Sequence, residues 1–496
     1  MLRRQFFGAG LFALLGFGIL GGGGTAMAEE KAYMPIWTNG TPGTIVVTDP
    51  KYGAYGDGVH DDTAAIQAAI DAGTDIYLPA GTYLLNPSGA NGKALDIATA
   101  GTRLRGAGRD VTTIRLANTA LDLLHIDADF CAVEGLTLDT QTDNAQAAVV
   151  IVANNTRLYR SRFLGGSNVF CIYFAGPAGA TQANPIYNTG NRVEHCIIND
   201  QFDGDGFSWS FQSGGIVRDI THTGSRIAIY ICENCVVERY DFTPGTHGST
   251  NGWYITAPSD NITIRDFTSH ADVNGAQGGV ISQDPTYKTT NVVLDRLTLL
   301  GSSNAYVQIG DVDGLDLITP NLEQNNSLLF EPQVKADHVR VLGGQVPQVS
   351  LNQGAAIPVD NLEFTGVHFP AFTAAGGQSP DTFINFNNGP TAIRIRGGRM
   401  SNADFSSGSG YTFDVAGLNG YNPRGSLTAP SIPASGTAYT NNFGVAVRVF
   451  ISGGTVSAIA INGTGTGLTS GPITLAPGET ITLTYTAAPT WTWFGL

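Results

Sequence analysis

Acidic and basic side chains gather in a short stretch of this chain, in a combination that suits acid–base chemistry. The stretch holds Asp203 and Asp205 in FDGDGFSW, His222 and Arg226 in THTGSRIAIY, and His247 in PGTHGSTNGWY. Residues i and i+2 of an extended strand lie ~6.6 Å apart on one face, and inverting glycosidases separate their two carboxyl groups by ~6.5–9.5 Å. Asp203 and Asp205 therefore fit an inverting pair, unless they only shape a glycine-rich turn.

The same stretch also offers the groups that a polysaccharide lyase or epimerase needs. Such an enzyme removes the C5 proton of a uronate with a base, and it balances the carboxylate with positive charge or Ca²⁺. His222, Arg226, His247 and Lys288 could supply these roles, although either histidine could equally be an ordinary surface loop residue. The sequence gives no sign of a cofactor or a metal site, so Ca²⁺ is expected only if the protein is a lyase or an epimerase.

A repeated strand pattern must position these residues. A small polar residue, a run of alternating apolar residues and a turn recur every 20 to 30 residues, with no helical stretch between them. This period is typical of a solenoid, here a parallel β-helix, whose coils bury their apolar faces only by stacking. Such a stack presents a long groove that suits a polymer better than a small metabolite. The repeats begin at Asn191, Gly214, Asn234, Asn261, Asn291, Asp313, Asp337 and Asp360.

The segment from Tyr52 to Leu85 shows how the stack begins. Asp61 or Asp62 can cap a short helix that ends near Asp71, and a turn at Pro79–Thr82 leads into the next strand. A helix here would cover the exposed end of the first coil.

This segment resembles the opening signature of the pectate-lyase-like right-handed parallel β-helix superfamily, in the branch that includes rhamnogalacturonase- and epimerase-like enzymes and phage tailspikes. The resemblance implies an all-β solenoid with an N-terminal capping helix. It also implies that Asp57, His60, Asp61 and Asp62 build the cap and its turns rather than a metal or acid cluster. The matching residues are Gly53, Gly56-Asp57-Gly58, Asp61-Asp62-Thr63, Ile66-Gln67 and Pro79-x-Gly81-x-Tyr83.

In that superfamily sugars usually lie across one exposed sheet, which places the expected substrate site. Aligned coils put the strands of this sheet at 168–175, 206–211, 226–232, 252–256, 278–283 and 306–310. Alternation along β-branched residues puts Tyr230 on the outside, whereas Phe207, Trp209 and Phe211 are expected in the core. The residues expected to bind the glycan are Tyr230, Trp253, Tyr254, Asn274, Gln277, Asp284, Tyr287, Lys288 and Tyr306.

The catalytic motifs of known members match only in part. Asp203-Gly204-Asp205-Gly206 can be compared with the first acidic motif of polygalacturonase-like enzymes, and Thr221–Arg226 loosely with their histidine motif. The paired Asp-Asp and the Arg-Ile-Lys motif of that family are missing, as is the Asp-Pro-His-Glu motif of alginate epimerases.

The N-terminus reads as an export signal over residues 1–28. Arg3 and Arg4 precede an apolar stretch, Ala26-Met27-Ala28 forms a cleavage site, and Arg-Arg-Gln-Phe-Phe resembles a twin-arginine signal. The alternative is a membrane anchor, but glycines interrupt the apolar stretch. We therefore expect a secreted or periplasmic protein that does not reside in a membrane.

Composition defines the remaining domains. We expect an N-terminal arm at 29–50, the β-helix catalytic domain at 51–405, a linker at 406–424 and a small β-sandwich module at 425–496. The module resembles C-terminal modules of phage tail proteins, and its final Trp-Thr-Trp-Phe could either stack on sugars or fill its own core. Cys232-Glu-Asn-Cys235 has the spacing of a metal or redox motif, although the position of these cysteines between strands favours buried packing.

The net charge of −15 disfavours nucleic acid and tilts the substrate towards a neutral glycan. Together these features predict an exported polysaccharide-degrading enzyme, with a glycoside hydrolase ahead of a polysaccharide lyase or epimerase acting on a uronate polymer. A non-catalytic tailspike- or adhesin-like module that binds glycan is the other alternative, and a tailspike relative would form a homotrimer.

Overall fold

The computed structural model describes most of the chain from residue 43 to residue 496. The residues predicted to form the export signal, 1–28, lie outside the described part, as does the arm up to residue 42. Within 43–496 the description leaves out 88–91, 118–119, 141–146, 166–169, 201–204, 247–250, 271–276, 302–304, 324–325, 352–358, 360, 371–383, 387–391, 401–411, 417–424, 428, 442 and 444–445.

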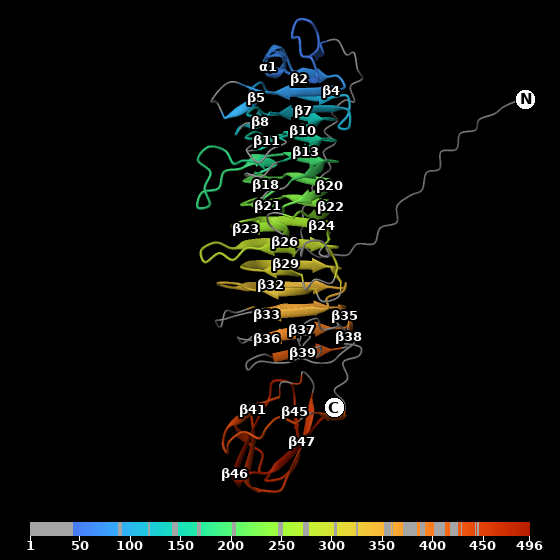
Figure 1. Ribbon diagram of the computed structural model, residues 1–496. Helices are drawn as coiled ribbons and strands as arrows, with labels where there is room; N and C mark the ends of the chain where they lie inside the picture. The colour runs from blue at the N-terminus through green and yellow to red at the C-terminus, as the bar shows by residue number, and fades with distance from the viewer. Residues whose placement is uncertain are drawn as a thin grey trace, which may run out of the picture. The chain divides into compact units, whose positions relative to one another are not determined.

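Parallel strands stack coil upon coil through most of the described residues, which confirms the predicted parallel β-helix (Figure 1). The described residues form a twelve-stranded sheet, called sheet 1 below, and a larger sheet, called sheet 2. Sheet 1 contains β5 (Lys93–Ile97), β8 (Asp122–Ile126), β11 (Val149–Ile151), β14 (Ile172–Phe174), β18 (Phe207–Ser210), β21 (Ile227–Tyr230), β23 (Asn251–Thr256), β25 (Gln277–Ile281), β28 (Tyr306–Ile309), β31 (Ser327–Phe330), β33 (Gln348–Leu351) and β36 (Ile384–Phe386).

Sheet 2 supplies the remaining sides of each coil. Its first strands are β1 (Ile45–Val46), β2 (Asp57–Asp61), β3 (Asp75–Leu78), β4 (Gly81–Leu85), β6 (Arg103–Gly106), β7 (Thr112–Leu116), β9 (Ala132–Glu134), β10 (Thr137–Asp139), β12 (Arg157–Tyr159), β13 (Arg162–Leu164), β16 (Arg192–Glu194) and β17 (Ile197–Asn199). Its later strands are β20 (Ile216–Gly224), β22 (Val236–Pro244), β24 (Asp260–His270), β26 (Thr289–Asp295), β27 (Thr298–Leu300), β29 (Val312–Ile318), β30 (Asn321–Leu322), β32 (Ala336–Leu342), β34 (Leu362–Thr365), β37 (Ala392–Arg396) and β39 (Thr412–Ala416).

The core consists of rows of inward side chains that continue from coil to coil. In sheet 1 one row runs through Ile126, Ile151, Phe174, Trp209 and Ile229, and each of these is at most 1% exposed. Burying one such side chain contributes ~1.5–3 kcal/mol, and each coil buries its own only against its neighbours. Stacking therefore provides the stability that no single coil could have.

A ladder of left-handed residues turns the chain from sheet 1 into sheet 2. Asn234, Asn261 and Asn291 occupy equivalent positions with φ of +54°, +53° and +53°, a conformation that asparagine tolerates better than most residues. The Asn261 amide also donates to Oδ1 of Asn234 at 2.7 Å. The small polar residue that begins each sequence repeat is therefore this corner residue or its immediate neighbour.

Helix α1 (Thr63–Ala72) packs Ile66, Ala69 and Ile70 onto the first coil. Asp62 lies at the N-cap position but makes no side-chain hydrogen bond to the helix; its carboxylate accepts the backbone N–H groups of Tyr55 and Gly56 at 2.6 and 3.0 Å instead. This acidic cluster shapes turns of the cap, as the resemblance implied. Among the described residues, no helix is long and apolar enough to cross a membrane.

The C-terminal module has two antiparallel four-stranded sheets around one core that includes Val449 and Leu483. Trp491 and Trp493 are 7% and 0% exposed, so they fill this core. The sheets are β40 (Gly425–Leu427), β47 (Thr490–Gly495), β42 (Val447–Ser452) and β45 (Gly471–Leu475), and β41 (Ala438–Thr440), β46 (Thr480–Ala487), β43 (Thr455–Ile461) and β44 (Thr464–Gly465).

Candidate functional site

The six strands predicted to carry the substrate are adjacent strands of sheet 1, in the order β14, β18, β21, β23, β25 and β28. Their outward side chains form a row in which small residues lie between two tyrosines. Ser208, Ala228 and Val280 are buried under their neighbours, whereas Tyr173 and Tyr254 stand partly exposed. The outer face of sheet 1 therefore offers aromatic ring surface above a floor of small side chains.

Four side chains from three strands or their leading turns meet on this face, and we call them the outer-face cluster: Asp205, Arg226, Tyr230 and Tyr254. Nε of Arg226 donates to Oδ1 of Asp205 at 2.5 Å, and the Tyr230 hydroxyl donates to Oδ2 of the same carboxylate. The guanidinium carbon of Arg226 lies 4.2 Å from the centre of the Tyr254 ring. Arg226 directly precedes β21 and Tyr230 ends it, so the two are four residues apart and point outward together, with the small Ala228 between them.

The electrostatics of the outer-face cluster suit an uncharged ligand. The Asp205 carboxylate and the Arg226 guanidinium cancel each other's charge at ion-pair distance. Burial, and then the neighbouring Asp205 carboxylate, raise the pKa of Tyr230 well above its usual value, so this phenol stays protonated at neutral pH and acts as a donor.

His222 does not lie on this face, and the prediction that it works at the polymer surface is wrong. Its side chain is 0% exposed and points into the core from β20, in the inward row that holds Ile198 on one coil and Phe242 on the next. Inside the core it is hydrogen-bonded to Asp200 and Tyr240. The alternation along β20 places Thr221 and Thr223, rather than His222, on the outside.

Trp253 also faces inward, so it cannot contact a glycan directly. It is 1% exposed, and a Cβ added to Gly279 on the next coil would lie 2.0 Å from its ring. The adjacent Tyr254 takes the outward position that had been expected for both residues. Phe207 and Trp209 occupy the core as expected, but Phe211 lies at a left-handed corner and packs half-buried against Gly176.

Several predicted site residues lie outside the described part of the chain. Asp203, His247 and Asn274 belong to segments that precede β18, β23 and β25, and Gln277 begins β25, with its backbone alone described. Their roles therefore remain predictions.

Asp284 holds a loop together by hydrogen bonds and does not stand free on the outer face of sheet 1. Its carboxylate accepts the backbone N–H groups of Thr286 and Tyr287 at 2.8 and 2.9 Å, and the amide of Gln182 at 2.7 Å. Although desolvation opposes it, this hydrogen bonding lowers the pKa of Asp284. The same Gln182 amide donates to the carbonyl of Ala257 at 2.8 Å, so the loop after β14 is tied to the ends of β23 and β25.

Gln182 is a residue that sequence reasoning missed, because its partners lie 75 and 102 residues away and no local pattern signals them. Of the other predicted contacts, Tyr287 and Lys288 are half-buried in the turn after β25. Tyr306 is half-buried on β28, two strands beyond Tyr254.

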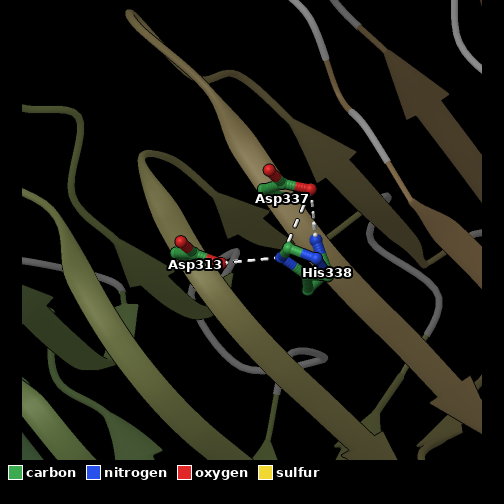
Figure 2. Close-up of side chains that lie close together, drawn as sticks. All are labelled: Asp313, Asp337 and His338. Carbon is green, nitrogen blue, oxygen red and sulfur yellow. Dashed lines mark hydrogen bonds and ion pairs between the residues drawn. The ribbon is translucent and has the colours of Figure 1, made fainter.

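A second group of ionisable side chains, Asp313, Asp337 and His338, lies near the starts of β29 and β32 (Figure 2). Nδ1 of His338 lies 2.9 Å from Asp313 and 3.4 Å from Asp337. The ammonium of Lys335 lies 2.7 Å from Asp337 and supplies positive charge there. We read this group as an ion-pair network in which His338 and Lys335 balance the two carboxylates.

Asp337→Asn is expected to lower the free energy of unfolding at neutral pH and to have little effect near pH 2. Although desolvation opposes it, hydrogen bonds from Lys335, Asn361 and the His338 backbone lower the pKa of Asp337 from 3.8 to about 2. Stability from a lowered carboxyl pKa is present above the unfolded value and is lost as the pH falls towards the folded one. Urea unfolding at both pH values measures the difference, and an equal loss at both would contradict it.

The outer face of sheet 2 carries many charges, but they pair with one another. Glu194 lies between Arg157 and Arg218, at 2.5 Å from each. Further along the stack, Glu238 is paired with Arg239 on its own strand and with Arg265 on the next coil. Positive and negative side chains alternate along these coils, so the described residues of this face show no concentration of one sign to attract a charged polymer.

Comparisons with known proteins agree with the fold. Residues 46–281 match the family described as rhamnogalacturonase A/epimerase, pectate lyase-like. The chain is 47% identical over 70 residues to mannuronan C5-epimerase AlgE4 of Azotobacter vinelandii, which is 13% of each protein. It is 58% identical over 40 residues to plasmin and fibronectin-binding protein A of Streptococcus pneumoniae, which is 7% of this chain and 6% of that protein. The matches thus span a small fraction of these relatives.

Some solved structures follow a similar course of the chain. One is the A-module of A. vinelandii mannuronan C-5 epimerase AlgE6, with a TM-score of 0.45 and 17% sequence identity. This match covers 76% of this chain and 100% of that one. The Dettilon tailspike protein has a TM-score of 0.41 and 12% identity over 91% and 94% of the two chains.

Proposed function

Because residues 46–281 match the rhamnogalacturonase A/epimerase, pectate lyase-like family, we propose that the chain is an enzyme that acts on a polysaccharide bound across the outer face of sheet 1. The observation that carries this proposal is the outer-face cluster, where an ion-paired carboxylate lies beside aromatic rings. Exposed tyrosine rings can pack on the apolar faces of pyranose units. Polar contacts to hydroxyl groups would come from the same tyrosines.

Hydrolysis of a neutral glycan is the reaction that the cluster suits best. An inverting hydrolase needs one carboxylate to activate water and one carboxylic acid to protonate the leaving oxygen. Asp205, held by Arg226 and Tyr230, takes the role of the carboxylate base. Asp203 takes the role of the acid, since it belongs to the segment that leads directly into Asp205. The charge balance within the cluster supports a substrate of little or no charge.

Epimerisation or β-elimination on a uronate polymer is the second candidate. It is supported by the family description and by the names of the A. vinelandii relatives. The protonated phenol of Tyr230 could return a proton to C5, and Arg226 could balance the uronate carboxylate. This route requires Arg226 to be shared between Asp205 and the substrate.

A panel of neutral and uronate polysaccharides tests both reactions with the purified protein. New reducing ends without ultraviolet absorbance of an unsaturated product would support hydrolysis. Reducing ends together with that absorbance would identify a lyase and overturn the hydrolase assignment. A change in uronate configuration without new ends, detected by proton NMR, would identify an epimerase. Binding of one polymer with none of these changes would indicate a non-catalytic glycan-binding module.

We also propose that residues 1–28 direct export to the periplasm or the medium. The support is the Arg3-Arg4 start, the glycine-rich apolar stretch and the Ala-Met-Ala site. N-terminal sequencing of the protein from the periplasmic or culture fraction is expected to begin at Glu29. Full-length protein retained in the cytoplasm would contradict the proposal.

A further inference from the structure

An ionisable network lies inside the apolar core, behind the outer-face cluster. The side chains of Asp200 and His222 have no exposed surface, and Tyr240 is 1% exposed. Nε2 of His222 lies 2.5 Å from Oδ2 of Asp200, and Nδ1 lies 2.6 Å from the Tyr240 hydroxyl. A histidine that donates from Nε2 and accepts at Nδ1 satisfies all three groups, as burial of polar groups requires.

Stability alone does not explain this network. The neighbours of His222 in the inward row are apolar, with Phe163 and Ile198 before it and Phe242 after it. Replacing a buried charged pair by well-packed apolar side chains is often neutral or stabilising. If this row had only a structural role, an aliphatic side chain would therefore suit it as well. The polar side chains of Asp200, His222 and Tyr240 indicate another role.

The Asp200 carboxylate contacts the backbone on both sides of the outer-face cluster. Its Oδ1 accepts the N–H of Ser225, the residue before Arg226, at 2.7 Å. A Cβ added to Gly206, the residue after Asp205, would lie 1.9 Å from Oδ2, and one added to Gly224 would lie 2.2 Å from Oδ1. The carboxylate is thus packed between the backbone segments that lead into β18 and β21.

We propose that Asp200 is a positioning residue, held by His222 and Tyr240, that fixes the distance between Asp205 and Arg226 on the outer face. The inference rests on the proposed function, because it takes the outer-face cluster as the reacting site. A misplacement of about 1 Å can cost ~100-fold in rate. Loss of Asp200 should therefore act on kcat far more than on KM, since the tyrosines that bind the glycan stay in place.

The test compares Asp200→Ala with Asp200→Asn in the full protein. Asn can keep both contacts, because its oxygen accepts from Ser225 and its amide donates to Nε2 once His222 shifts its proton to Nδ1. One readout is kcat on the glycan found in the panel. The other needs no substrate: the Nε–H signal of Arg226 in isotope-labelled arginine NMR, assigned with Arg226→Lys and protected from exchange by Asp205.

Asp200→Ala is expected to lose the protected signal and about 100-fold in kcat, whereas Asp200→Asn keeps the signal and most of the activity. Leu299→Ala, in the same inward row, is the control: it should lower stability and leave the signal intact. If Asp200→Ala does not fold, Gly206→Ala displaces the carboxylate instead.

A signal that survives in Asp200→Ala, and in Gly206→Ala where that variant is used, would overturn the proposal. An equal loss of the signal and of kcat in Asp200→Asn would also overturn it, because the effect would then come from charge rather than from position. If the wild-type protein changes no glycan, the proposed function fails, and the NMR comparison still decides whether Asp200 positions the pair.

Discussion

Asp205→Asn is expected to lower kcat on the glycan by roughly 10²–10⁴-fold, the usual contribution of a general acid or base. The asparagine keeps the shape of the side chain and one oxygen acceptor, but it cannot take a proton from water. The charge that balances Arg226 is lost as well, so KM for a neutral polymer should change much less than kcat. Initial rates at several polymer concentrations separate the two constants.

Asp219→Asn is the matched control for this experiment. Asp219 is also an aspartate that accepts from the Nε of an arginine, Arg239, at 2.6 Å, but it lies at a corner within sheet 2. Asparagine suits its left-handed conformation. This variant should therefore keep wild-type turnover. Similar losses in the two variants would point to a general effect of broken ion pairs and remove Asp205 from the reacting site.

Trp253→Ala is expected to lower the free energy of unfolding by ~3–5 kcal/mol, the range for large buried aromatic side chains. Trp253 fills the core where Gly279 of the next coil leaves room, so its loss opens a cavity that the rigid stack cannot close. Urea unfolding monitored by circular dichroism measures the change.

Tyr254→Ala, one residue further on, separates the two faces of the strand. Tyr254 is outward and packs against Arg226, so its removal should cost little stability and weaken glycan binding about tenfold, or ~1.4 kcal/mol. Titration calorimetry with the active polymer measures the binding. If the alanine at 253 weakened binding and that at 254 weakened folding, the inward and outward assignment of β23 would be reversed.

The fold could be predicted from the sequence because its signals are local and repeated. Asparagine recurs where the backbone needs a positive φ, as at Asn234, Asn261 and Asn291, and apolar residues alternate between these corners. The cap signature adds the helix that closes the first coil. All of these follow from residues close together in the chain.

The candidate site was less predictable, because facing direction and long-range partners decide it. Successive residues of a strand point to opposite faces, so Trp253 and Tyr254 cannot both lie on the outer face, and the sequence alone does not show which one does. His222 was placed at the surface because its partners, Asp200 and Tyr240, lie 22 and 18 residues away on other coils. The sequence pattern correctly placed Asp205 and Arg226 close together, but it did not predict that they form an ion pair.

The number of residues in the corner ladder also sets the length of the outer face of sheet 1. Each of these coils contributes one residue to the ladder of Asn234, Asn261 and Asn291 and one strand to sheet 1, and adjacent strands are ~4.8 Å apart. Gain or loss of a whole coil, corner to corner, would change the groove by that increment and leave the remaining coils in register. The length of this outer face is therefore set by the number of coils, which evolution can adjust without redesigning the core.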